Sequence, residues 1–134
     1  MDAIFLDANV LFSATWRSDS GLLRLWQLKG VRLLTSSYAV EEARVNLPGE
    51  DQRRRLEDLL GRLEMVATPS NLPLPGSVTL PDKDRPILLA ALAAQATHLL
   101  TGDVEHFGAY YDRKVGSLII LRPSEYLRRY RPKS

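Results

Sequence analysis

The sequence predicts a single α/β domain over residues 1–134, in which helices on both faces cover a central, parallel sheet. Short apolar runs alternate along the chain with stretches of helical spacing, a pattern typical of a parallel α/β sheet. A chain of 134 residues has the usual length of one domain and is long enough to bury a core without disulfides. The first run, Ala3 to Leu6, is apolar throughout, as expected of a strand buried on both faces. We therefore expect a three-layer α/β/α domain.

The elements of the first half follow from apolar spacing and from residues that begin or end helices. Residues 9–14 begin a helix or form a loop, and residues 22–28 have helical spacing after N-cap candidates between Ser18 and Ser20. Gly30 ends that segment. The elements expected next are a strand at residues 32–34, a helix from Ser36 or Ser37 toward Leu47, an amphipathic helix at 50–63 and a strand at 64–67.

The second half begins with a loop and ends with a short helix. Residues 68–81 contain four prolines and one glycine, which predicts a loop rather than a linker between domains. Pro86 suits the first turn of a helix, and the alanine- and leucine-rich residues 87–96 predict a buried helix. The elements expected after it are strands at 98–100 and 118–121 and a last helix capped by Ser124.

Composition indicates a soluble protein, and its basic clusters suit a polyanionic partner, although charge alone favours a solvated surface. The formal net charge is only +2, but residues 122–134 contain five basic side chains and one acidic side chain, and Arg53 to Arg55 form a second basic cluster. Such clusters suit nucleic acid, although a solvated helix face has the same composition. The chain has no cysteine, no leader-like first segment and no apolar stretch of membrane-spanning length. We expect a cytosolic protein with no membrane partner.

Four carboxylates stand after apolar runs or on predicted helices: Asp7, Glu42, Asp84 and Asp103. Ligands of open α/β sheets bind at the carboxyl ends of the strands, and carboxylates gathered there repel one another unless a hard cation holds them. The pattern therefore points to a Mg²⁺ or Mn²⁺ site. Each acid also has an ordinary structural interpretation, as a helix cap, a solvated helix position or a turn residue. Thr101, two residues before Asp103, can hydrogen-bond a neighbouring carboxylate.

Taken together, these segments resemble the PIN-domain family. The family pattern is a strand ending in Asp-x-Asn-Val-Leu, a helical glutamate, an aspartate that begins a long apolar helix, and Thr-x-Asp after a strand. In this chain the corresponding segments are residues 6–11, 37–47, 82–88 and 99–103. The resemblance covers nearly the whole chain in the right order, and four motifs in order are far more specific than any one of them.

The resemblance implies a doubly wound α/β fold and a metal-dependent endoribonuclease, of the kind found in VapC-like toxins that pair with an antitoxin. It also implies a homodimer. Carried over by position, the catalytic and metal-binding acids are Asp7, Glu42, Asp84 and Asp103, and the supporting polar residues are Asn9, Thr101 and Asp82. Glu41 lies next to Glu42, so the position of the glutamate ligand stays open. The long proline-rich loop before Asp82 is not part of the family pattern.

The expected mechanism is hydrolysis of RNA at one or two Mg²⁺ or Mn²⁺ ions held by the four acids, in which an ion activates a water molecule. Charge alone suggests Arg85, Arg113 and Lys114 as phosphate-binding residues. We expect no histidine to serve as a base, and we interpret His98 and His106 as structural.

Two alternatives remain at this point. The first is a PIN-fold module that binds RNA or regulates without catalysis, although an RNA-binding surface has no use for four acids. The second is a DNA-directed metal nuclease, which the sequence does not distinguish from an RNA-directed one because both use the same metal site. No glycine-rich phosphate loop is present, which argues against an NTPase or a dinucleotide-binding protein.

Overall fold

A computed structural model describes residues 1–70 and 72–131, and its described part contains a six-stranded sheet. Lys133 of the predicted basic tail and the last residues of the predicted domain 1–134 lie outside the described residues. The strands are β1 (Asp2–Leu6), β2 (Val31–Ser36), β3 (Glu64–Val66), β4 (His98–Leu100), β5 (Lys114–Val115) and β6 (Leu118–Leu121). Their order in the sheet is β3-β2-β1-β4-β6-β5.

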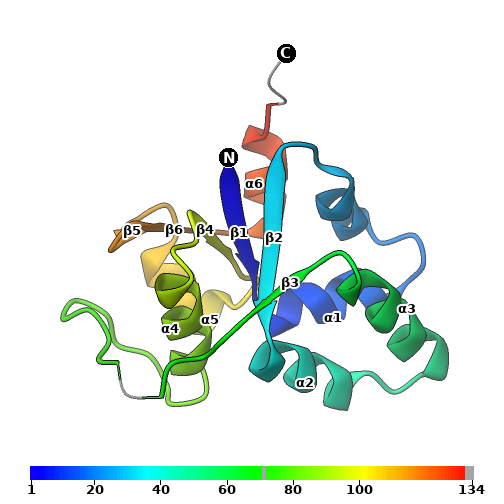
Figure 1. The fold of residues 1–134 in the computed structure, drawn as a ribbon, viewed down its shortest axis with the longest axis horizontal. Helices are drawn as coiled ribbons and strands as arrows, with labels where there is room; N and C mark the ends of the chain where they lie inside the picture. Colours follow the sequence, from blue (N-terminus) through cyan, green and yellow to red (C-terminus); the bar gives the residue numbers. More distant parts are fainter. Residues whose placement is uncertain (71, 132–134) are drawn as a thin grey trace.

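Helices cover both sides of this sheet, as predicted. They are α1 (Ala8–Trp16), the 3₁₀ helix η1 (Gly21–Gln27), α2 (Ser37–Asn46), α3 (Glu50–Leu60), α4 (Arg85–Ala93), α5 (Val104–Phe107), the 3₁₀ helix η2 (Gly108–Tyr110) and α6 (Pro123–Arg129). Figure 1 shows α1, α2 and α3 on one side of β1 and β2, and α4 and α5 on the other. It also shows α6 beside the N-terminus, at the end of the molecule opposite to α2.

The sheet is parallel except at one edge. Strand β1 is central and pairs in parallel with β2 and β4, and β4 pairs in parallel with β6. Only β5 is antiparallel within the described sheet, where it forms a short hairpin with β6. The predicted parallel α/β architecture is therefore confirmed, with an antiparallel edge strand that the sequence did not suggest.

The core lies between the central strands and the helices on each face. Residues 3–6 of β1 are all buried, which confirms the prediction of a strand covered on both faces. Helix α4 is buried at every position from Ile87 to Ala91, so the alanine- and leucine-rich helix is confirmed as internal. No helix in the described ranges is both long enough and apolar enough to cross a bilayer.

The segment at residues 22–28 is helical, but it is a 3₁₀ helix rather than an α-helix. Ser20 caps it and accepts a hydrogen bond from the backbone N–H of Leu22. Leu25 and Trp26 are buried, and the Trp26 indole donates to the Leu59 carbonyl at 3.2 Å. A seven-residue segment needs to present only two or three apolar side chains, and the tighter 3₁₀ winding does this within a short connection.

The prediction that Ser124 caps the last helix is wrong. The N-cap is Arg122 and the helix begins at Pro123, whose fixed φ and missing N–H suit the first helical position. The sequence also gave no indication of α5, η2 or β5. These elements are two to four residues long and are too short to establish a hydrophobic period.

Candidate active site

The predicted acids line one cavity at the carboxyl ends of β1 and β4. These strands are parallel neighbours with Leu6 opposite Leu100, so the residues that follow them meet at one edge of the sheet. The cavity has a volume of about 540 Å³. Its lining consists of Asp7, Ala8, Asn9, Phe12, Ser13, Glu42, Ala43, Asn46, Lys83, Asp84, Gly102 and Asp103. The fold thus brings together carboxylates from four separate segments.

Asp7 is held in a fixed orientation at the floor of this cavity. It is only 3% exposed, and it is the N-cap of α1. Its Oδ1 accepts a hydrogen bond from the Ala8 backbone N–H at 2.6 Å, and its Oδ2 accepts one from the Thr101 hydroxyl at 2.8 Å. Asp7 is therefore both a helix cap and a cavity-lining acid, so the two interpretations that the sequence left open are compatible.

Asn9, Thr101 and Gly102 connect the loop after β1 to the loop after β4. The Asn9 side-chain amide donates to Asp7 Oδ2 at 3.1 Å and to the Thr101 hydroxyl at 3.2 Å. Asn9 Oδ1 accepts a hydrogen bond from the Gly102 N–H at 2.7 Å. The Thr101 hydroxyl also accepts from the Asp103 N–H at 3.1 Å. The predicted supporting residues Asn9 and Thr101 thus fix the positions of two acids.

Gly102 leaves the space that this connection needs. A Cβ built on Gly102 would lie 3.3 Å from Asn9 Oδ1, closer than ordinary van der Waals contact. We expect Gly102→Ala to displace Asn9 by a few tenths of an ångström and to lower the RNA cleavage that the sequence predicts by about tenfold, because small misplacements of positioning groups are costly. The measurement is kcat/KM together with the melting temperature. Gly21→Ala is the control, since a Cβ there meets nothing within 4 Å.

Asp103 and Asp84 meet across His106. The His106 ring nitrogen Nδ1 lies 2.7 Å from Asp103 Oδ2 and 3.0 Å from Asp84 Oδ2. Asp84 is buried and precedes α4, yet its side chain makes no capping hydrogen bond. Asp84 Oδ2 is fully buried and has no hydrogen-bond partner among the described residues. A buried carboxylate oxygen without a donor is costly, and this oxygen faces other potential metal ligands.

The two neighbouring glutamates of α2, Glu41 and Glu42, lie in different environments. Glu42 is among the residues that line the cavity. Glu41 pairs instead with Arg44 on its own helix at 2.8 Å, and its side chain is 62% exposed. Adjacent helical residues differ by about 100° in direction, so only one of the two can face the acids. The geometry favours Glu42.

Burial and crowding make Asp7, Glu42 and Asp84 hard to ionise. The pKa of Asp7 is raised to about 6, chiefly by burial and in addition by the nearby charges of Asp84 and Glu42, although hydrogen bonds from Thr101 and Ala8 lower it. The pKa values of Glu42 and Asp84 are also raised, in both cases first by burial. A divalent cation would relieve this cost, because it stabilises every ionised carboxylate that contacts it.

These residues fit a divalent metal ion. Carboxylate oxygens are the preferred ligands of Mg²⁺ and Mn²⁺, and the unpartnered oxygen of Asp84 lies among them. Asp84, Asp103 and His106 each offer a ligand atom, and these atoms lie within 4.8 Å of one another.

Several predicted residues lie outside the lining of the cavity. Asp82 is exposed in the turn before α4, and Arg85 is the first residue of that helix. Arg113 is exposed just before the edge strand β5, and Lys114 is the exposed first residue of that strand. Their assigned roles stay predictions. Lys83, Ser13 and Asn46 line the cavity but were not expected there, although Lys83 stands between two predicted acids. His106 lies between two of the site acids, Asp84 and Asp103, and its structural role stays a prediction.

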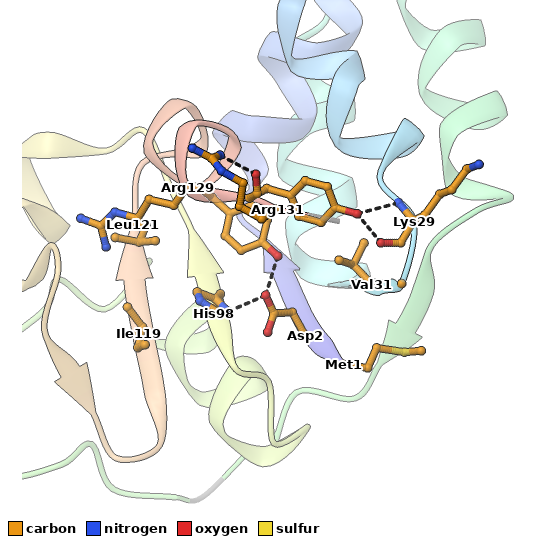
Figure 2. Close-up of a pocket in the computed structure, with 12 residues that line it drawn as sticks. Met1, Asp2, Lys29, Val31, His98, Ile119, Leu121, Arg129 and Arg131 are labelled. Carbon is orange, nitrogen blue, oxygen red and sulfur yellow. Dashed lines mark hydrogen bonds and ion pairs between the residues drawn. The ribbon is translucent and has the colours of Figure 1, made fainter. Parts of the chain in front are cut away.

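A second cavity, of about 660 Å³, lies among β1, β4, β6 and α6. Figure 2 shows Asp2 and His98 side by side in it, with Arg129 and Arg131 nearby. Asp2 Oδ2 accepts a hydrogen bond from the Tyr126 hydroxyl at 2.6 Å. With one acid and several cations in its lining, this cavity lacks the donor set of a metal site.

Comparison with known proteins agrees with the fold and with the motifs. A family model described as "PIN domain" matches residues 3–105, a range that includes all four acids. Among solved structures, the chain is similar to VapBC2 from Rickettsia felis bound to a DNA fragment from their promoter, with 20% identity, a TM-score of 0.66 and coverage of 90% of this chain and 98% of that chain. It is also similar to FitAcB from Neisseria gonorrhoeae, with 18% identity, a TM-score of 0.52 and coverage of 90% and 98%. No curated protein sequence matches it.

Proposed function

This chain belongs to the PIN-domain family, and from that membership we propose that it is a metal-dependent endoribonuclease. The observation that carries the proposal is the convergence of Asp7, Glu42, Asp84 and Asp103 on one cavity, where one buried oxygen of Asp84 lacks a donor. These four acids are the proposed catalytic and metal-binding residues. The proposed ion is Mg²⁺ or Mn²⁺, because oxygen ligands predominate.

Hydrogen bonds within the chain hold the proposed metal-binding acids in the positions that the reaction needs. A bound divalent ion would supply Lewis-acid activation of water and neutralise charge on the phosphate. Asp7 is oriented by Thr101 and by the start of α1, and Asp103 is oriented by the backbone and side chain of His106. These hydrogen bonds keep the acids in place before substrate arrives, so the free-energy cost of bringing the acids together is offset during folding.

Two cations flank the acids and suit an RNA backbone. Lys83 lines the acid cavity, and Arg122 lines a neighbouring hollow that shares Asn9, Ser13 and Gly102 with it. The Arg122 guanidinium lies 5.1 Å from the centre of the Tyr111 ring. Basic groups that track the backbone and aromatic or guanidinium planes that stack on bases are the usual means of binding single strands. We infer that RNA crosses the cavity between Lys83 and Arg122.

We expect Lys83→Ala to raise KM for RNA by about three- to tenfold, with a smaller change in kcat. The reason is that Lys83 offers a charge to a phosphate beside the cut bond, and one phosphate contact contributes a modest, salt-dependent share of binding. Steady-state kinetics at two salt concentrations measure the effect. Lys29→Ala is the control, because Lys29 lines the second cavity. Equal effects of the two variants would contradict the inferred path.

We further propose that the chain is the toxin of a type II toxin–antitoxin system, bound by a protein antitoxin and assembled as a homodimer. The resemblance to VapC-like toxins supports this role, and the similarity to VapBC2 and FitAcB agrees with it. Exposed apolar side chains on the helices next to the cavity, Trp16 on α1 and Val45 on α2, offer surface for a partner.

A cleavage panel tests the nuclease proposal. Structured and single-stranded RNA and DNA are incubated with wild type and with Asp7→Asn, in Mg²⁺, in Mn²⁺ and in EDTA. The proposal predicts RNA cutting that needs metal and is lost in the variant. DNA cutting with the same dependence would favour the DNA-directed alternative, and RNA binding without any cutting would favour the binding module.

A further inference from the structure

His106 is not one of the four proposed metal-binding acids, yet its ring contacts two of them. Nδ1 is 2.7 Å from Asp103 Oδ2 and 3.0 Å from Asp84 Oδ2. A single proton on Nδ1 can be donated to only one carboxylate, and the described structure leaves Asp84 Oδ2 buried without a donor. The arrangement therefore leaves Asp84 Oδ2 without a hydrogen-bond donor, beside a nitrogen that can itself bind a metal.

We propose that His106 Nδ1 is a metal ligand together with Asp84 and Asp103, and that this nitrogen gives the site a preference for Mn²⁺ over Mg²⁺. The inference rests on the proposed function, which requires a divalent ion in this cavity. It goes beyond that function by adding a ligand of a different chemical class and by assigning a choice between the two ions.

The separations between the three groups suit neighbouring ligands of one ion. Adjacent ligands of an octahedral ion with bonds of about 2.1 Å lie roughly 3 Å apart. The two contacts of His106 Nδ1, 2.7 Å and 3.0 Å, match that spacing. All three ligand atoms also lie within 4.8 Å of one another, so one ion can reach them together.

Local structure, rather than a metal, positions the imidazole. Asp103 is the N-cap of α5, and its Oδ1 accepts a hydrogen bond from the His106 N–H at 3.1 Å. Phe107 is fully buried and donates its N–H to the Asp103 carbonyl at 2.9 Å, which anchors the short helix. The three-residue spacing then turns the His106 ring back over Asp103. The ligand is thus placed before an ion arrives.

The chemistry of the nitrogen determines the expected selectivity. Carboxylate oxygens suit both ions, but Mn²⁺, a transition metal, accepts an imidazole nitrogen more readily than Mg²⁺, which strongly prefers oxygen and keeps much of its water. When Nδ1 binds a metal, the ring proton resides on Nε2. A site made only of carboxylates would discriminate less between Mn²⁺ and Mg²⁺.

Spectroscopy of Mn²⁺ bound to the full chain tests the proposal. Protein freed of metal with EDTA is loaded with MnCl₂, and pulsed EPR detects ¹⁴N nuclei of a directly bound imidazole. Wild type and the control His98→Gln should both show this nitrogen coupling, since His98 lies in the second cavity. His106→Gln, whose amide can still donate to Asp103, should lose it. Calorimetric titration should show that Mn²⁺ affinity falls at least about tenfold in His106→Gln, while Mg²⁺ affinity changes much less.

The possible failures are distinguishable. Mn²⁺ bound to wild type without nitrogen coupling, or a coupling that survives in His106→Gln, would overturn the proposal but leave the four-acid site standing. Equal losses of Mg²⁺ and Mn²⁺ affinity, without nitrogen coupling, would also overturn it, because His106 would then only orient Asp103. If wild type binds neither ion, the metal site of the proposed function fails as well.

Discussion

Replacing Asp103 by asparagine is expected to reduce metal-dependent RNA cleavage by roughly a thousandfold, because the metal supplies several kcal/mol of transition-state stabilisation. The Asp103 carboxylate contacts His106, which also contacts Asp84, and it lines the acid cavity. An asparagine cannot provide the negative charge that holds a divalent ion. The measurement is single-turnover cleavage of a labelled RNA with saturating Mg²⁺.

The fold should tolerate this change. Asp103 caps α5 through an oxygen that asparagine also possesses, and asparagine is as good a helix cap as aspartate. The melting temperature of Asp103→Asn should therefore stay within a few degrees of wild type. Glu105→Gln is the matched control, because Glu105 is exposed on the same short helix and does not line the cavity. Full activity of Asp103→Asn would contradict the assignment of Asp103 to the metal site.

The second large effect concerns the stability of the metal-free protein. Burial raises the pKa of Asp7 from 3.8 to about 6 in the folded state. Between these two values the folded protein keeps a proton that the unfolded chain has released, so stability falls as the pH rises through this interval. By about pH 7 the loss is nearly complete and amounts to about 3 kcal/mol, at 1.4 kcal/mol for each pKa unit.

A variant isolates this contribution from those of other groups. Asp7→Asn does not titrate, so the free energy of unfolding of wild type minus that of the variant should fall by about 2 kcal/mol between pH 4 and pH 7. Urea unfolding in EDTA at several pH values measures the difference. Saturating Mn²⁺ should restore the stability of wild type at pH 7, because the ion binds the folded state. A difference that does not vary with pH would mean that Asp7 titrates normally.

The positions of Asp7 and Thr101 could be predicted from the sequence for a simple reason. Each directly follows an apolar run, and parallel strands in one sheet place their carboxyl ends together. The position of Asp84 could also be predicted, because Pro86 and the apolar run after it locate the start of a helix. In each case a local feature of the sequence determines where the side chain lies.

Glu42 and His106 illustrate what local features do not determine. The choice between Glu41 and Glu42 depends on how α2 rotates against α1, which follows from tertiary packing. His106 belongs to a four-residue helix too short for a hydrophobic period, and its contact with Asp84 joins two distant segments. The 3₁₀ geometry of η1 and the edge strand β5 escaped prediction for the same reason, since short elements form where the surrounding packing permits them.

The most direct test of the account is RNA cleavage by the matched pair Glu42→Gln and Glu41→Gln in Mg²⁺. The two residues are adjacent on α2, but only Glu42 lines the acid cavity, whereas Glu41 pairs with Arg44. The four-acid site predicts that Glu42→Gln loses cleavage by at least about a hundredfold and that Glu41→Gln stays near wild type, because a surface ion pair contributes little. Equal activity of the two variants, or loss only in Glu41→Gln, would contradict the site.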